Sequence, residues 1–154
     1  MSDSKTYDVP SHVANYAHIN AETYAQLYAQ SIEKPAQFWA EQANTFLDWH
    51  HPWHTVLAHD FVKAHIRWFE GGKLNVSYNC LDRHLEKRAN QTAIIWEGDN
   101  PDQDKQLTYQ QLHEQVCQFA NVLRKHGVQK GDRVCIYMPM IVEVAIVMLA
   151  CTRI

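Results

Sequence analysis

A long apolar run near the end of the sequence restricts the possible folds more than any other feature. Residues 134–150 are apolar apart from Pro139 and Glu143. A membrane-spanning helix needs about 20 apolar residues without such a break. Proline is tolerated in the first turn of a helix, where its missing N–H has no partner. The run therefore predicts a buried strand over residues 133–138 and a helix starting near Pro139, and it does not favour a membrane span.

The segment before this run carries the clearest local signal in the chain. Thr108 and Gln111 have capping-box spacing, in which the hydroxyl accepts from the third helical N–H and the amide reaches back to the cap. Leu107 and Leu112 flank the box at the spacing of a hydrophobic staple. An apolar stripe then continues at helical spacing: Leu112, Val116, Phe119, Ala120 and Leu123. An amphipathic helix is predicted over residues 109–126, ended by Gly127.

Strands and helices alternate from residue 92 onward. Residues 92–97 are rich in apolar and β-branched side chains, a polar turn follows at 98–102, and residues 105–107 predict a short returning strand. Together with the strand at 133–138, this order is typical of an α/β fold with a parallel sheet. The last helix reaches residue 154 without a cap, a glycine or a polar tail. We therefore expect a truncated α/β subdomain that leaves apolar surface uncovered.

The first part of the chain predicts helices. Residues 1–19 carry few large apolar groups and are expected to form a flexible N-terminus. Asn20 is the predicted cap of one helix, and Pro35 opens a second with apolar residues at helical spacing. Asn79 is the predicted cap of a third helix, with Asp82 near its positive end. This segment therefore predicts a helical N-terminal extension in front of the α/β subdomain.

Charge and cysteine content exclude several classes of partner. The net charge of −3 arises from 14 basic and 17 acidic residues, which predicts no nucleic-acid or anionic-membrane partner. Residues 1–20 lack the basic start and apolar core of a signal peptide. Four cysteines form no CxxC pair, and three lie in apolar runs, where reduced core thiols are expected: Cys80, Cys117, Cys135 and Cys151. These features favour a cytoplasmic location.

Residues that could bind a metal or a base have a simpler structural interpretation. His50, His51 and His54 cluster, but no HExxH pair and no nearby cysteine accompany them, so packing is favoured over a metal site. Asp82, Arg83 and His84 are consecutive, and adjacent helix residues point about 100° apart, so they do not converge by themselves. Five tryptophans are interpreted as core rather than as a stacking platform: Trp39, Trp49, Trp53, Trp68 and Trp96.

The motifs of nucleotide binding and nucleophilic catalysis do not occur. The five glycines form neither GxxxxGK[ST] nor GxGxxG, and no serine, cysteine or lysine has a recognisable activating partner. The sequence therefore assigns no catalytic, no cofactor-binding and no metal-binding residue.

Several blocks of sequence resemble one family in order and spacing, from about residue 22 to residue 154. They are YAQLYAQSIEKPAQFW (24–39), WFEGGKLNVSYNCLDRHL (68–85), AIIWEGD (93–99), LTYQQL (107–112), GVQKGDRVCIYMPM (127–140) and MLACTRI (148–154). LTYQQL followed by GDRV is typical of the adenylate-forming enzymes in general. The block at 68–85 is more specific and is similar to the short-chain acyl-CoA synthetases. The chain thus resembles the acetyl-CoA synthetase branch of the adenylate-forming enzymes.

The resemblance implies an acetate–CoA ligase that uses acetate, ATP, CoA and Mg²⁺ and passes through an acetyl-adenylate. It implies an N-terminal extension at residues 20–90 and the beginning of the AMP-binding domain at 91–154. The family's phosphate loop, nucleotide site and C-terminal lid would lie beyond Ile154, in a C-terminal remainder that is the expected partner of this chain. The chain alone is therefore predicted to be inactive. A propionyl-CoA synthetase fragment and a stand-alone, non-catalytic interaction module are the alternatives.

Overall fold

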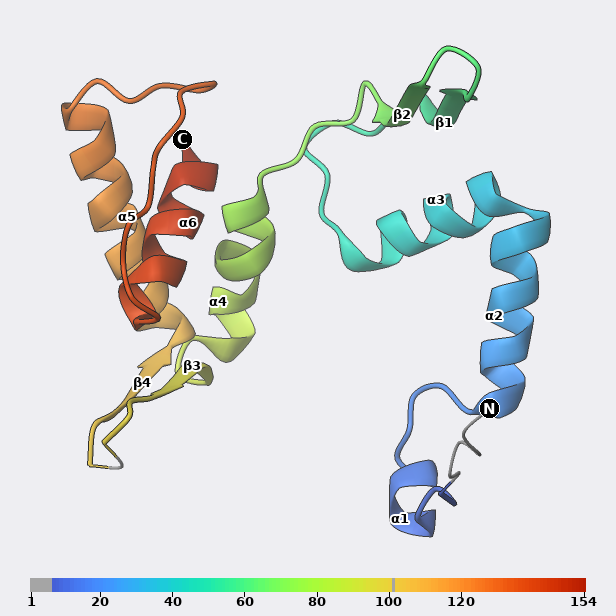
Figure 1. The fold of residues 1–154 in the computed structure, drawn as a ribbon, viewed down its shortest axis with the longest axis horizontal. Helices are drawn as coiled ribbons and strands as arrows, with labels where there is room; N and C mark the ends of the chain where they lie inside the picture. Colours follow the sequence, from blue (N-terminus) through green and yellow to red (C-terminus); the bar gives the residue numbers. More distant parts are fainter. Residues whose placement is uncertain (1–6, 101) are drawn as a thin grey trace, which may run out of the picture. The chain divides into compact units, whose positions relative to one another are not determined.

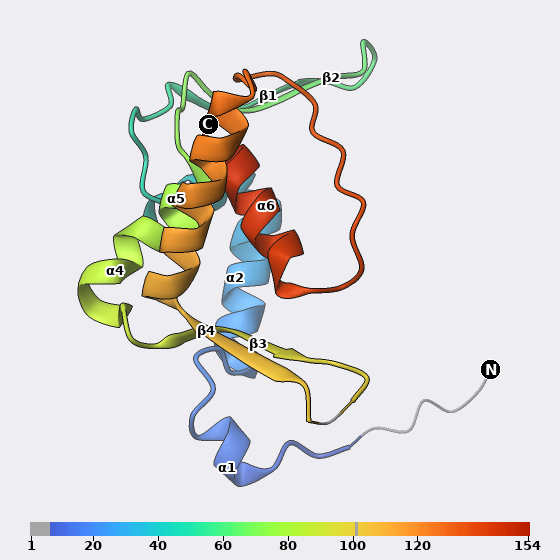
Figure 2. The same ribbon diagram turned by 90° about the vertical axis from the view of Figure 1, so that its left-hand side faces the viewer.

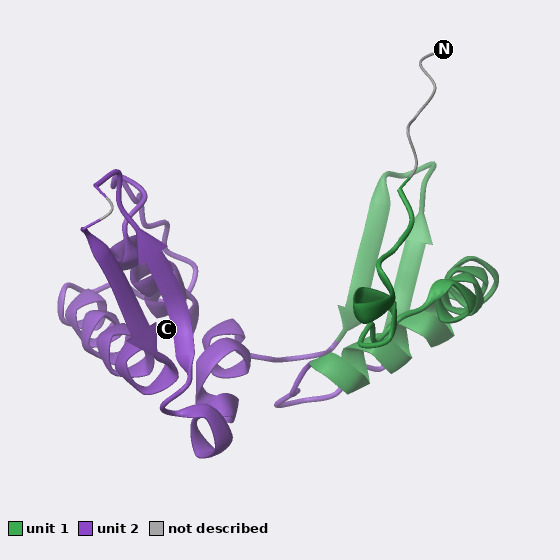
Figure 3. Ribbon diagram, turned by 90° about the horizontal axis from the view of Figure 1, so that it is seen from below, with its two compact units in different colours: residues 1–46, 55–70 green, residues 47–54, 71–154 purple. Residues whose placement is uncertain are grey.

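The computed structural model describes residues 7–100 and 102–154, which fold as two compact units. Unit 1 contains residues 1–46 and 55–70, and unit 2 contains residues 47–54 and 71–154 (Figure 3). Both units combine helices with a two-stranded antiparallel sheet (Figure 1). No helix in the described ranges is long and apolar enough to cross a membrane.

Unit 1 contains three helices and one β-hairpin. Its elements are α1 (Ser11–Ala14), α2 (Ala21–Glu33), α3 (Pro35–Phe46), β1 (Thr55–Asp60) and β2 (His65–Glu70). The predicted cap of α2 is confirmed, because Asn20 Oδ1 accepts from the Thr23 N–H at 2.8 Å. Pro35 opens α3 as predicted. The strands β1 and β2 pair in antiparallel register, and α3 contacts β1.

Unit 2 contains a second hairpin, a pair of packed helices and one irregular helix. Its elements are η1 (Tyr78–Asp82), α4 (Arg83–Arg88), β3 (Thr92–Glu97), β4 (Asp104–Thr108), α5 (Tyr109–Lys125) and α6 (Val142–Arg153). The strands β3 and β4 pair antiparallel, and α5 and α6 lie side by side (Figure 2).

The capping box at the start of α5 is confirmed. The Gln111 N–H donates to Thr108 Oγ1 at 3.2 Å, and the Thr108 N–H donates to Gln111 Oε1 at 2.9 Å. Gly127 follows α5 with a φ of +86°, a left-handed conformation that favours glycine. The predicted apolar stripe of α5 faces a core shared by β4, α6 and η1. The buried members of this core are Leu81, Leu107, Leu112, Val116, Ala120, Val142, Ile146 and Ala150.

The strand predicted over residues 133–138 is wrong. No ladder pairing holds this segment among the residues described, and the Tyr137 side chain is 100% exposed. An apolar segment becomes a strand only when a neighbouring strand offers backbone partners. The two sheets are antiparallel hairpins, so the described residues do not form the predicted parallel sheet. The following helix begins at Val142 rather than near Pro139.

The helix predicted to start at Asn79 begins earlier. The Tyr78 N–H donates to Asn75 Oδ1 at 2.9 Å, so Asn75 is the cap. Asn79 instead lies inside η1, a turn of π-helix, and is buried. Its side chain accepts from the Asp48 N–H at 2.8 Å and donates to the Asp48 carbonyl at 3.0 Å. Asp82 therefore lies well within the helical segment and not at its positive end.

The tryptophans are less buried than predicted. Trp39 and Trp68 are exposed and pack edge to face, with ring centroids 6.1 Å apart, and the other three are half-buried. Trp49 packs on Trp53 in the same manner. The Trp96 N–H donates to the Met140 carbonyl at 2.7 Å and so ties the segment before α6 to β3. The interpretation as core residues is therefore wrong for Trp39 and Trp68, whereas Trp96 packs against the core of unit 2.

Candidate functional site

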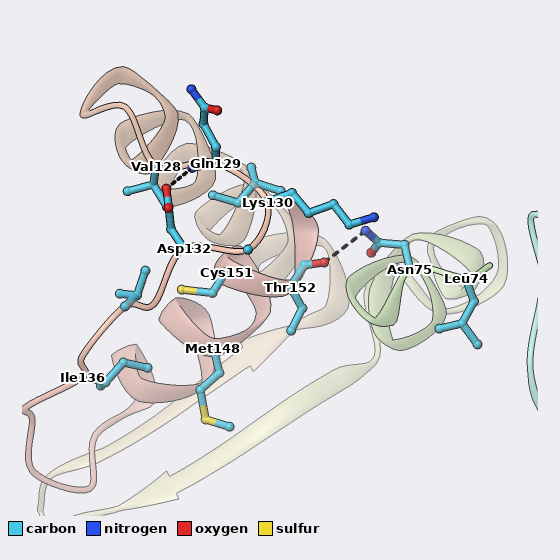
Figure 4. Close-up of a pocket in the computed structure, with 13 residues that line it drawn as sticks. Leu74, Asn75, Val128, Gln129, Lys130, Asp132, Ile136, Met148, Cys151 and Thr152 are labelled. Carbon is cyan, nitrogen blue, oxygen red and sulfur yellow. Dashed lines mark hydrogen bonds between the residues drawn. The ribbon is translucent and has the colours of Figure 1, made fainter. Parts of the chain in front are cut away.

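A hollow of about 490 Å³ lies beside the C-terminal half of α6 (Figure 4). This volume is within the range of about 300–1,000 Å³ that is common for ligand sites. Its lining residues come from three segments: Leu74, Asn75, Val128, Gln129, Lys130, Gly131, Asp132, Val134, Ile136, Met148, Cys151, Thr152 and Ile154. Most of them are apolar. The hollow therefore offers a surface suited to burying hydrophobic groups.

The chemistry of the hollow does not fit a nucleoside triphosphate. Among the described lining residues, Lys130 supplies the one cation. Asp132 contributes a carboxylate, which already accepts from the Gln129 N–H at 2.7 Å. A triphosphate needs several converging N–H donors and cations, usually from a glycine-rich loop. We therefore assign no ATP contact to this hollow.

A charged cluster lies where α6 ends. Arg153 donates to both oxygens of Asp82, with Nη1–Oδ2 and Nη2–Oδ1 distances of 2.7 Å. Nη1 also donates to Ser77 Oγ at 3.3 Å. The two charged side chains are 25% and 21% exposed, so water screens them only partly. Bidentate pairs of this kind are among the stronger and more directional polar contacts in proteins.

This ion pair shifts the titration of both partners. Hydrogen bonds from Arg153 hold the pKa of the Asp82 carboxyl below its usual value; burial opposes this, and the charge of Arg153 reinforces it. The same hydrogen bonds raise the pKa of Arg153. Both groups therefore stay ionised at neutral pH.

Asn75 joins the ends of two helices. Its Oδ1 caps the helical segment that continues into η1, accepting from the Tyr78 N–H. Its Nδ2 donates to the Thr152 carbonyl at 3.1 Å (Figure 4). It also donates to the Arg153 carbonyl at 3.4 Å. The last carbonyls of a helix lack intrahelical partners. One amide side chain thus satisfies polar groups at the start of one helix and at the end of α6.

His113 and Cys117 complete the cluster without forming a catalytic triad. Nε2 of His113 lies 3.3 Å from Asp82 Oδ1, 3.4 Å from Arg153 Nη2 and 3.5 Å from Cys117 Sγ. In a triad the nucleophile and the carboxylate face opposite ring nitrogens, so that the base is oriented from behind. Here all three groups approach the same nitrogen. The arrangement is therefore an anchoring network and not an activated thiol.

Of the consecutive residues Asp82, Arg83 and His84, Asp82 turns away from the other two, which contact each other. Asp82 turns to Arg153, while Arg83 lies 3.6 Å from the Asp48 carboxylate. Arg83 Nε also donates to His84 Nε2 at 3.3 Å. Burial, followed by the charge of Arg83, lowers the pKa of His84. The interpretation of Asp82 as a helix-start carboxylate is wrong, because its partner lies 71 residues away and no local pattern indicates it.

The clustered histidines have local partners. The His50 ring packs on Tyr78 with centroids 5.6 Å apart, and His51 Nδ1 lies 2.7 Å from the Pro52 carbonyl oxygen. A Cβ added to Gly71 would lie 2.6 Å from the His54 ring, so glycine is required beside it. In the described part of the chain, no group of three or more metal-ligand side chains comes together.

The cysteines are free thiols, and none of the four is fully buried. Cys117 and Cys151 are half-buried, so they are only partly covered, whereas their apolar surroundings predicted core thiols. Cys135 is exposed because the segment at 133–138 is not a buried strand. The expectation that it is a core thiol is therefore wrong.

Two family models together match residues 24–154. Residues 24–80 match the acetyl-coenzyme A synthetase N-terminus, and residues 81–154 match the AMP-binding enzyme family. The boundary between the two matches falls inside η1.

Curated relatives align over the whole chain. Acetyl-coenzyme A synthetases from Magnetococcus marinus and Saccharophagus degradans are each 60% identical over 154 residues, and the one from Alkalilimnicola ehrlichii is 56% identical. The chain spans 24% of the length of each of these relatives.

A solved structure shares the arrangement of the elements. The acetoacetyl-CoA synthetase from Streptomyces lividans matches 92% of this chain with a TM-score of 0.76 and 28% sequence identity, and the match covers 22% of that protein. The predicted class, a helical N-terminal extension followed by an α/β segment of the adenylate-forming fold, is confirmed by this match. The pairing of the strands within this chain remains antiparallel, as described above.

Proposed function

Because the chain belongs to the acetyl-coenzyme A synthetase branch of the AMP-binding enzymes, we propose that it forms the N-terminal part of an acetate–CoA ligase. Such a ligase joins acetate to ATP as an acetyl-adenylate, releases pyrophosphate and transfers the acetyl group to CoA. The observation that carries the proposal is the match to acetyl-coenzyme A synthetases, which covers the whole chain at 53–60% identity.

ATP, CoA and Mg²⁺ enter the proposal as requirements of the complete enzyme. The charge needed to stabilise a transferring phosphate group comes from metal ions and converging donors. The hollow beside α6 supplies Lys130 and apolar walls, which do not fit that demand. We therefore give the described residues a structural role and assign no catalytic, nucleotide or metal contact to them. In a polypeptide as long as the curated relatives, the segment after residue 154 would supply those groups.

The proposed division of the chain lies about ten residues after the junction of the two family matches. A flexible N-terminus at residues 1–19 would precede an N-terminal extension at 20–90 and the start of the AMP-binding domain at 91–154. The two family matches, which meet between residues 80 and 81, support a division near this position. Four free thiols support a cytoplasmic location, because disulfides are rare in reducing compartments.

A chimeric enzyme tests the proposal directly. The 154 residues would replace the matching region of the Magnetococcus marinus acetyl-coenzyme A synthetase, and acetate-dependent ATP–pyrophosphate exchange would be measured. Exchange comparable to that of the parent enzyme is expected. The 154-residue chain alone, assayed in parallel, should show no exchange above buffer. A soluble, folded chimera without exchange would overturn the proposal.

The choice of acyl substrate is the second question for this chimera. The structural similarity to an acetoacetyl-CoA synthetase shows that this framework also occurs with another short acyl group. Acetate, propionate and acetoacetate would therefore be compared in the same assay. A preference for acetate is expected. A preference for propionate or acetoacetate in the chimera, against acetate in the parent, would show that these 154 residues influence acyl choice.

A further inference from the structure

We propose that Asn75, Ser77 and Asp82 form a socket that fixes the C-terminal end of α6, and that Asp82 and Arg153 are positioning residues for the proposed ligase. The inference rests on the proposed function only where it concerns the reaction. The socket itself is defined by contacts within unit 2. We call these three residues the α6 socket.

The socket holds both the backbone and the side chain at the end of α6. Asn75 donates to the carbonyls of Thr152 and Arg153. Ser77 Oγ and both carboxylate oxygens of Asp82 accept from the Arg153 guanidinium. Five polar contacts thus converge on two consecutive residues. Both Ser77, which is fully buried, and Leu81, which joins the core, keep this helical segment fixed.

The rest of α6 has weaker directional contacts, among them the exposed Lys105–Glu143 ion pair near its start. Its buried face consists of Val142, Ile146, Val147 and Ala150, which pack by hydrophobic contact. Burial of apolar area is non-directional, so it resists separation of the helices better than sliding or rotation. A bidentate ion pair and a capped helix end have fixed geometry. The socket is therefore the feature that sets the register of α6 against its neighbours.

The socket also crosses the family boundary. Asn75 and Ser77 belong to the segment that matches the acetyl-coenzyme A synthetase N-terminus, whereas α6 belongs to the segment that matches the AMP-binding enzymes. The end of the N-terminal segment thus holds the last described turn of α6 in the AMP-binding segment. This is the route by which residues without a catalytic role would affect the reaction.

A second ion pair on α6 provides a matched control. Lys105 Nζ lies 3.2 Å from Glu143 Oε1 near the start of the helix, and these side chains are 44% and 48% exposed. Exposed pairs of this kind contribute little. Replacement of Lys105 therefore removes an ion pair from the same helix without disturbing the socket.

The first experiment uses the chimera described above. Asp82→Asn removes the negative charge of the ion pair. Arg153→Lys keeps the positive charge but loses the bidentate contact with Asp82. Asn75→Ala removes only the capping hydrogen bonds of the Asn75 side chain. A small misplacement of a catalytic framework can lower kcat on the order of tenfold to a hundredfold. We expect Asp82→Asn and Arg153→Lys to lower kcat by at least about tenfold at temperatures well below unfolding, with a smaller change in the KM for acetate. Lys105→Ala should keep the parental kcat.

The readouts separate positioning from simple stability. A purely structural role would lower the unfolding temperature and leave kcat per folded molecule unchanged, and that result would overturn the positioning role. Should the soluble, folded chimera be inactive, the proposed ligase function fails, and the socket is tested on that same chimera by amide hydrogen exchange. Faster exchange over residues 148–153 in Asp82→Asn than in Lys105→Ala supports the socket. Equal exchange in the two variants overturns it.

Discussion

At the residue scale, polar side chains do more to fix unit 2 than the sequence pattern suggests. The capping box at Thr108 and Gln111 could be predicted because its two partners are three residues apart. The choice between Asn75 and Asn79 as the cap could not be predicted from the sequence. It depends on the contact of Asn79 with Asp48, which is 31 residues away. The Asp82–Arg153 pair is more distant still. Prediction from sequence thus succeeds where the partners of a polar group are local.

The capping box leads to a prediction for Thr108→Ala. Loss of the hydroxyl leaves the Gln111 N–H without its cap, which typically costs about 1 kcal/mol of stability. Chemical denaturation of the chimera should show this loss, while the KM for acetate stays within twofold or so, because a cap acts on the helix and not on a ligand. Gln118→Ala, at an exposed position of α5, is the control and should leave stability nearly unchanged. A tenfold or larger rise in KM at unchanged stability would instead indicate a substrate role.

The ion pair leads to a prediction about pH. The folded-state pKa of Asp82 is lower than its ordinary value, so its ionised form stabilises the folded state above the unfolded-state pKa of about 4. That contribution is lost as the pH falls below about 4 and through the folded-state pKa. Thermal melts of wild type and Asp82→Asn should therefore differ most near neutral pH and converge on acidification. A difference that stays constant from pH 6 to pH 3 would contradict the role of the carboxylate charge.

At the scale of elements, periodic patterns predicted α2, α3, α5, β3 and β4, whereas residues 133–138 were assigned wrongly. Helices form from contacts within one segment, so a period and a cap suffice to identify them. A strand depends on a second segment, and β3 takes β4 as its partner. The continuous apolar run within 133–138 therefore identifies a segment capable of pairing but does not show that it is paired. The hollow beside α6 was missed for the same reason, since it is assembled from three distant segments.

The helix pair α5 and α6 leads to a prediction about core packing. Leu112 is buried between β4 and α6, and Leu→Ala changes at such sites cost about 2–5 kcal/mol. Val122, on the same helix, is 46% exposed. Val122→Ala should change stability by about 0.5 kcal/mol or less. Denaturant unfolding followed by circular dichroism measures both variants, and equal losses would show that α5 is not held by this face.

At the scale of the whole molecule, large apolar side chains remain exposed in both units. They include Trp39 and Trp68 in unit 1 and Tyr137, Met138, Met140 and Met148 in unit 2. Exposed patches of this kind favour association. We therefore expect the isolated 154-residue chain to bind a hydrophobic dye and to scatter light at micromolar concentration, more strongly than the chimera. A monodisperse monomer with a sharp two-state melt would contradict this expectation.

The amide of Asn75 has a practical consequence for spectroscopy. Because its oxygen and its nitrogen bond to the ends of two different helices, fraying at either end releases one half of the side chain. Its two NH₂ protons stay protected from solvent exchange only while α6 remains docked. The side-chain oxygen of Asn75 accepts from the Tyr78 N–H and therefore reports on the other helix. In a ¹⁵N-labelled sample, this single pair of resonances would report on both helix ends. Its dispersed chemical shifts would be lost as soon as either end opens.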